Sequence, residues 1–187
     1  MEQKELDEIL ESHDRLLQGE NGECAKLYRA DLFWANLHRA NLHRANLRQA
    51  DLHRANLCRA NLIGADLAGA DLRRANLCGA NLIGANLREA DLRYANFAEA
   101  SGLSVLCVQV NTSCENRRIT YIPSLDVVTA GCFQGEFEEF EKRVEEEHKD
   151  NPFVLSRYRR VIAFLKREAE EDRAREKEMA TVDEERR

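Results

Sequence analysis

The sequence contains no run of about 18 apolar residues, the length that a membrane-spanning helix needs, and 33% of its 187 residues are charged. Its acidic start, Met1 to Glu5, lacks the basic and apolar regions of a secretion signal. The six cysteines include no Cys-x-x-Cys pair and do not follow the pattern of a secreted disulfide framework. These absences argue against a membrane protein, and we expect a cytoplasmic protein with reduced thiols.

Catalytic motifs are missing as well. The sequence has no glycine-rich phosphate loop, no Gly-x-Ser-x-Gly turn and no acidic pair that stands apart from its repeated aspartates. No motif surrounds any of the five histidines, which are His13, His38, His43, His53 and His148. The sequence therefore predicts that the protein is not an enzyme and that it uses no cofactor.

What the sequence does contain is a five-residue repeat. Alanine occupies every fifth position from Ala25 to Ala95, and Leu follows two residues later in each unit except the last, where Phe97 takes its place. Asp or Asn stands between them in every unit but the first. Neither the helical period of 3.6 nor the strand period of 2 divides five, so only a coil with corners can keep both residues inside.

A second period of twenty residues lies over the first. Ala55-Asn56-Leu57-Cys58 returns as Ala75-Asn76-Leu77-Cys78, as expected if four units make one turn of the coil. Asn and Asp suit the corners because their short side chains bond local backbone groups, and repetition without slippage argues against a disordered tract. One ladder of stacked interior leucines is expected to comprise Leu32, Leu52, Leu72 and Leu92.

These repeats resemble the pentapeptide-repeat family, and the resemblance implies a right-handed quadrilateral β-helix. The lead-in from Leu6 to Leu27, with a helix, a His and a Gly-containing turn, resembles members of bacterial and phage origin. Leu16-Leu17 stands where that resemblance implies Trp-Leu. The Gly131-Cys132-Phe133 segment and the helices after it resemble the C-terminal region of some phage-type members.

We expect four segments along the chain, in a mainly β protein. Residues 1–23 should form a capping helix and turn, in which Leu6, Ile9, Leu10, His13, Leu16 and Leu17 share one face. Residues 24–100 should form about four coils, and residues 101–134 should hold three short strands at 105–110, 118–122 and 126–129. Residues 135–187 should form a helical hairpin, followed from Glu168 by a charged tail that is either a solvated helix end or disordered.

Stacking every twenty residues places equivalent outward side chains about 4.8 Å apart, so surface columns can be deduced from the sequence. One column consists of Asp31, Asp51, Asp71 and Asp91, and arginines and aromatic residues lie beside it. Arginines next to exposed aromatic residues are typical of partner-binding hot spots; alternatively, the arginines only neutralise the aspartate column. The candidate partner-binding residues are Trp34, Arg54, Arg73, Arg74, Arg93 and Tyr94.

Two further columns carry side chains of types that occur in binding sites. His38, Cys58 and Cys78 have the side-chain types that bind zinc, but parallel stacked side chains do not converge and no fourth ligand is apparent. The sequence therefore predicts no metal site. Ile63 and Ile83, beside glycines, form a small apolar strip that is either a contact patch or ordinary surface.

The charge pattern separates the binding hypotheses. Net charge is −6 over residues 1–24, +4 over residues 25–100 and −4 over residues 101–187. Fifteen units give a rod of roughly 18 Å, against ~34 Å for one turn of duplex DNA.

We therefore expect an interaction scaffold with an unknown protein partner, or a homodimer through the C-terminal region. Mimicry of DNA bound to gyrase, which the family resemblance offers as the alternative, requires a longer and negative surface. The aspartate column and the acidic ends also argue against nucleic acid as a partner.

Overall fold

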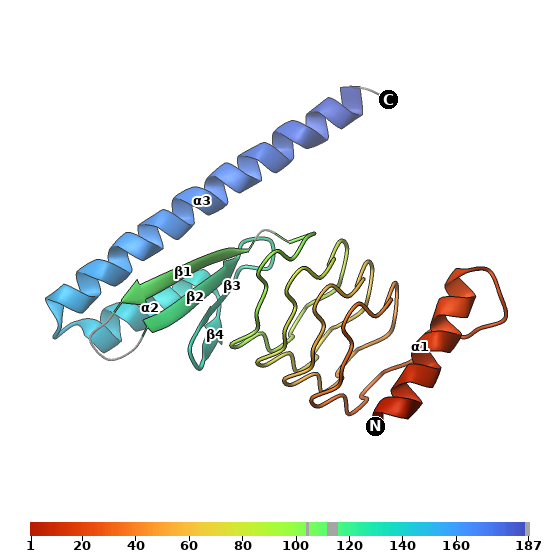
Figure 1. Ribbon diagram of the computed structural model, residues 1–187. Helices are drawn as coiled ribbons and strands as arrows, with labels where there is room; N and C mark the ends of the chain where they lie inside the picture. Colours follow the sequence, from red (N-terminus) through yellow and green to blue (C-terminus); the bar gives the residue numbers. More distant parts are fainter. Residues whose placement is uncertain (104, 112–115, 186–187) are drawn as a thin grey trace. The chain divides into compact units, whose positions relative to one another are not determined.

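The computed structural model describes residues 1–103, 105–111 and 116–185, and its contacts divide the chain into two compact units. The first unit, Met1–Leu103, holds one helix and the repeats. The second unit, Ser104–Arg187, holds a four-stranded sheet and two helices (Figure 1). Each unit is described separately below.

The repeats form coils that are stacked through isolated parallel bridges between residues twenty positions apart (Figure 1). The bridges run from Lys26↔Asn46 to Asn81↔Ser101. In the middle of the array, Leu62 N–H donates to the carbonyl of Asn81 at 2.8 Å, and Asn81 N–H donates back to Ala60 at 2.9 Å. The twenty-residue period is therefore confirmed. The expectation of a mainly β chain needs a correction, because the repeats contribute single-residue bridges and the regular strands described all lie in the second unit.

Leucine side chains fill the inside of the coils. Leu32, Leu52, Leu72 and Leu92 are each at most 1% exposed, and Phe97, which replaces Leu in the last unit, is 5% exposed. The repeat alanines of the inner coils are fully buried, whereas several of those in the outer coils, such as Ala35 and Ala85, are half-buried. An outer coil has a neighbouring coil on one side only, so its alanines keep some contact with solvent.

The Asp or Asn before each Leu folds its side chain back onto the chain. Asn61 Oδ1 accepts the backbone N–H of Ile63 at 3.2 Å, and the same bond recurs from unit to unit. Asparagines also bond to one another between coils, as where Asn61 Nδ2 donates to Asn41 Oδ1 at 3.1 Å. The sequence-based expectation that these side chains bond local backbone is confirmed.

Helix α1 (Gln3–Leu17) lies against the first coil. Leu6 and His13 are buried, Ile9 and Leu10 are half-buried, but Leu16 and Leu17 are about 40% exposed. The expectation of one apolar face along the whole helix is thus wrong for its last turn. The chain then turns so closely over the helix that a Cβ at Gly22 would lie 2.1 Å from the carbonyl oxygen of Ser12. Glycine is needed there for close approach.

The second unit is an antiparallel sheet packed against two helices. The strands follow the order β1-β2-β3-β4. Three of them match the expected strands, whereas β4 falls in a segment that was expected only to lead into a helix. The elements are β1 (Leu106–Asn111), β2 (Asn116–Ile122), β3 (Val127–Ala130), β4 (Phe133–Gly135), α2 (Phe137–His148) and α3 (Pro152–Glu185).

The core of this unit lies between the sheet and the two helices. Tyr121 of β2 meets Phe137 of α2 with ring centroids 4.5 Å apart, and Phe140 meets Tyr158 of α3 at 6.5 Å. Buried side chains of α3 continue to Leu165 and Ala169. Beyond them the charged tail continues as helix to Glu185, which decides between the two expectations for it; residues 186–187 lie outside the described part.

No helix in the described part of the chain is long and apolar enough to cross a membrane. Cys24, Cys58, Cys78 and Cys107 are free thiols. Cys114 lies outside the described residues.

Candidate interaction face

The candidate face is built on the turn at the fifth position of each unit. All fifteen fifth positions, from Arg29 to Glu99, have a positive φ between 56° and 67°. Glycine adopts this left-handed conformation freely, whereas other side chains are disfavoured in it. Four of these positions are glycine, namely Gly64, Gly69, Gly79 and Gly84. Every other fifth position carries a side chain at some conformational cost.

The fifth positions form columns along the stacked coils. Three of these columns contain glycine, but the column beside the aspartates does not. It consists of Trp34, Arg54, Arg74 and Tyr94, which we call the fifth-position column, with φ values of 59°, 61°, 58° and 63°. Trp34 is 61% exposed and Tyr94 is 54% exposed. Large aromatic side chains are thus held in solvent on a backbone conformation that suits glycine better.

Within this column each arginine lies over an aromatic ring of a neighbouring coil. The guanidinium of Arg54 lies 5.1 Å from the ring centroid of Trp34, and that of Arg74 lies 5.5 Å from Tyr94. Both distances are within the range of cation–π attraction. Within the described part of the chain, neither arginine forms an ion pair. The two cations therefore lie on adjacent coils between two exposed rings.

The arginines one position earlier behave differently. Arg73 Nε donates to Asp71 Oδ1 at 2.8 Å and lies 3.6 Å from Asp91 Oδ2. Arg93 Nε donates to Asp91 Oδ1 at 2.8 Å. These two arginines neutralise like charges that are stacked along the coils, as the second sequence-based interpretation predicted for the column as a whole.

The pKa values of the two paired aspartates reflect these contacts. Burial would raise the pKa of Asp71, but hydrogen bonds from the side chain and backbone of Arg73 outweigh burial, and the net shift is downward. The pKa of Asp91 is lowered in the same way, with Arg93 as the hydrogen-bond donor. Hydrogen bonding to the aspartate raises the pKa of Arg73. Both pairs are therefore charged at neutral pH.

A small aromatic cluster extends the face at the first coil. The ring of Phe33 meets Trp34 edge-on at 6.2 Å and His53 at 5.4 Å. Phe33 is 49% exposed. The twenty-residue period places Phe33 and His53 in one column, but neither is among the candidate residues from the sequence.

The His38, Cys58 and Cys78 column has no metal-binding geometry. In the described part of the chain, no three His, Cys, Asp or Glu side chains are grouped so that they could hold an ion. Ile83 is 53% exposed and Ile63 is half-buried, so the strip at these positions exposes a single large apolar side chain.

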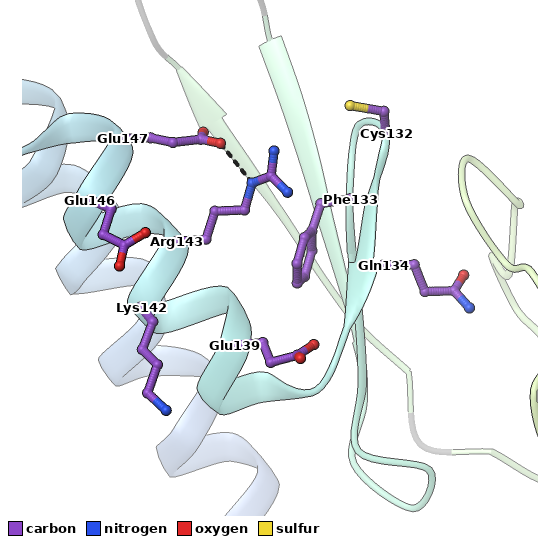
Figure 2. Close-up of a pocket in the computed structure, with 8 residues that line it drawn as sticks. All are labelled: Cys132, Phe133, Gln134, Glu139, Lys142, Arg143, Glu146 and Glu147. Atoms are coloured by element: carbon purple, nitrogen blue, oxygen red, sulfur yellow. Dashed lines mark hydrogen bonds and ion pairs between the residues drawn. The ribbon is translucent and has the colours of Figure 1, made fainter.

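The second unit has a shallow groove of about 580 Å³ between β4 and α2 (Figure 2). Arg143 donates to Glu147 at 2.6 Å, and its guanidinium lies 5.5 Å from the ring centroid of Phe133. Glu139 and Glu146 add further negative charge to the lining. Because the arginine already binds a carboxylate, we assign no ligand to this groove.

The repeats also define the family. The family model for pentapeptide repeats matches eight copies, over residues 25–62, 35–74 and 65–101. The chain belongs to the pentapeptide-repeat family. None of the curated proteins matches the chain.

Three solved structures represent the similar proteins. A pentapeptide repeat protein from Nostoc PCC 7120 is 40% identical over 48% of this chain and 71% of its own, with a TM-score of 0.42. One from the thylakoid lumen of Arabidopsis thaliana is 31% identical over 42% of this chain and 61% of its own, with a TM-score of 0.34. HetL from Nostoc sp. strain PCC 7120, which is involved in heterocyst differentiation regulation, is 46% identical over 38% of this chain and 35% of its own, with a TM-score of 0.27.

Proposed function

We propose that the protein is a non-enzymatic scaffold whose repeats, as a right-handed quadrilateral β-helix, hold the fifth-position column toward a protein partner. Four five-residue units with one turn each account for the twenty-residue coil. Members of the family are generally non-enzymatic. The right-handed, four-sided shape is taken from the same family.

The observation that carries this proposal is that the arginines at the fourth and fifth positions make different contacts. Arg73 and Arg93 are engaged with the aspartate column. Arg54 and Arg74 lie on exposed rings instead, with guanidinium donors that a partner's carboxylates can bind. Trp34 and Tyr94 supply the large apolar area that anchors interfaces.

The absence of glycine supports the same face. Each of the neighbouring columns has glycine in at least one coil, as at Gly64, Gly69 and Gly79, whereas this column has a large side chain in every coil. Keeping Trp, Arg, Arg and Tyr in the left-handed conformation has a conformational cost in each unit. A binding role gives a reason for that cost.

The test is a quantitative pull-down from the organism that encodes the chain, with the Arg54→Glu/Arg74→Glu variant compared with the wild type. We expect a specific protein to be retained by the wild type and lost with the variant. The matched control is Arg39→Glu/Arg59→Glu, because these arginines occupy the same left-handed position in adjacent coils on another face.

Two results would reject the face. One is a partner that both variants lose equally, which would indicate a response to overall charge. The other is a partner that both variants keep, which would return Arg54 and Arg74 to ordinary surface. Trp34→Gly tests the aromatic anchor separately, because glycine fits the backbone at this position.

A further inference from the structure

Cys58 and Cys78 occupy the same place in two adjacent coils. The segments that carry them are hydrogen-bonded in register, since Asn56 bridges Asn76 and Arg59 N–H donates to the carbonyl of Cys78 at 2.8 Å. In each segment the cysteine N–H donates to the Asn side chain two residues earlier, at 3.2 Å. The two cysteines therefore have the same backbone setting and outward direction.

The spacing of the coils suits a covalent link between them. Stacked strands lie about 4.8 Å apart, and disulfides join residues whose Cα atoms are roughly 4.4–6.8 Å apart. Parallel Cβ directions keep the Cβ atoms near that same ~4.8 Å, slightly above the ~3.5–4.5 Å of relaxed disulfides. A bond here would form with some strain, and strained disulfides are the easily reduced ones.

Both thiols are free and half-buried, so a small oxidant can reach them. The neighbouring positions leave room at the surface, because Gly79 follows Cys78 with no side chain. We propose that Cys58 and Cys78 form a reversible disulfide between adjacent coils when the protein meets a hydroperoxide. The site is independent of the proposed partner-binding face, which lies in other columns.

The chemistry balances with hydrogen peroxide as the oxidant. One thiolate attacks a peroxide oxygen, the O–O bond breaks, and a sulfenic acid and a hydroxide form; the hydroxide takes up the proton that the thiol released and gives the first water. The second thiolate then attacks the sulfenic sulfur, the S–O bond breaks, and the released hydroxide takes a proton to give the second water. In total, two thiols are oxidised to one disulfide and one peroxide is reduced to two waters.

The rate of this reaction should rise with pH. Burial raises the pKa of the Cys78 thiol, and the charge and hydrogen bond of Cys58 raise it further, as does the charge of Glu99. Because the thiolate is the reacting form, Cys78 should react more slowly near neutral pH than in alkaline solution.

The experiment exposes the full-length protein to hydrogen peroxide, alkylates the remaining thiols and maps disulfide-linked peptides by mass spectrometry. We expect a peptide pair joining Cys58 to Cys78, removed by dithiothreitol. The oxidised protein should melt several degrees higher than the reduced protein, because the bond closes a loop of the unfolded chain. Cys58→Ser and Cys78→Ser should each abolish both the linked peptides and the rise.

A second measurement does not depend on oxidation. Phenylarsine oxide binds two neighbouring thiols through one arsenic atom, so it should add to the wild type and to neither single variant. A chain in which Cys24, Cys107, Cys114 and Cys132 are replaced by Ser should keep both responses. The proposal is overturned if peroxide oxidises the exposed Cys107 while Cys58 and Cys78 remain thiols. It is also overturned if they become separate sulfinic acids, or if the arsenical adds equally to Cys58→Ser and the wild type.

Discussion

The side-chain amide of Gln3 forms hydrogen bonds with both the backbone N–H and the backbone carbonyl of Asn36. Asn36 N–H donates to Gln3 Oε1 at 3.0 Å, and Gln3 Nε2 donates to the carbonyl of Asn36 at 3.0 Å. In the next coils the same backbone groups bond to a neighbouring coil, but Asn36 belongs to the first coil and has none below it. Gln3 of the helix thus satisfies backbone groups of Asn36 at the open edge of the first coil, which would otherwise be available for strand pairing.

We predict that Gln3→Ala lowers the free energy of unfolding by about 1–3 kcal/mol, because two hydrogen bonds are lost and each usually contributes about 0.5–1.5 kcal/mol. Gln3→Glu should also destabilise, because a carboxylate can accept from Asn36 N–H but cannot donate to its carbonyl. Urea titration measures both. Gln18→Ala, in an exposed glutamine at the end of the same helix, is the control and should change little; equal losses in Gln3→Ala and Gln18→Ala would contradict the edge-pairing role.

His13 makes a second contact of this kind. Its Nδ1 accepts the backbone N–H of Ala25 at 3.2 Å inside the unit, where His13 is only 1% exposed. We predict that His13→Leu, which removes the acceptor, costs about 1–3 kcal/mol because a buried N–H is left unsatisfied. His13→Asn keeps an acceptor and should lose less. Urea titration and sedimentation would reveal the ranking, and equal stability of the two variants would rule out the hydrogen bond as the cause.

Leu62 tests the interior of the coils. It is fully buried in the middle of the array, so Leu62→Ala should cost about 2–5 kcal/mol, the range for truncation of a packed core leucine. Ile83→Ala, at a position that is 53% exposed, is the control and should cost much less. If Leu62→Ala lowers the free energy of unfolding by less than about 1 kcal/mol in a denaturant titration, either neighbouring side chains fill the cavity or the leucine is not in the core.

The coils could be predicted from the sequence because their rule is strictly local and periodic. Each unit repeats the same turn, so the positions of Leu62 and Asn61 follow from counting by five and twenty. Gln3 could not be predicted in the same way. Its bond to Asn36 spans 33 residues and depends on where the helix lies on the first coil. The β4 strand was missed for a related reason, since three residues pair only because β3 lies beside them.

The candidate face was only half predictable. Column membership followed from the period, and so did the proximity of Arg73 to Asp71. The sequence could not distinguish Arg73 from Arg74, because two adjacent arginines look alike in a repeat. They differ because the fourth position directs the guanidinium to the aspartate column and the fifth directs it to the ring of a neighbouring coil.

Acid should weaken the first unit through the aspartate column. The pKa values of Asp71 and Asp91 are lowered from the ordinary 3.8 in the folded chain. Their contribution to stability is therefore complete above the unfolded pKa and is lost as the pH falls below it, through the lower folded pKa. The window begins near pH 4 or a little above (~3.9 for unfolded Asp).

We predict that the urea midpoint of the wild type falls between pH 7 and pH 3 by more than that of Asp71→Asn/Asp91→Asn. Asparagine keeps the turn hydrogen bond but has no charge to lose. Asp31→Asn is the matched control, because Asp31 makes the same turn to Phe33, which has no guanidinium. It should retain the wild-type pH dependence; a double variant as acid-sensitive as the wild type would show that other groups cause the loss.

The last prediction concerns the gyrase alternative. A DNA mimic must present closely spaced negative charge over a length comparable to the duplex it replaces. Here the carboxylates of Asp71 and Asp91 are paired with Arg73 and Arg93, and the repeats as a whole have a net charge of +4. We therefore expect that the purified protein neither inhibits gyrase supercoiling nor protects the enzyme from a quinolone.

A supercoiling assay with equimolar protein and enzyme tests this directly. If the Arg54→Glu/Arg74→Glu variant still protects gyrase, mimicry replaces the scaffold as the proposed function. If this variant no longer protects gyrase, the enzyme is identified as a partner of the fifth-position column.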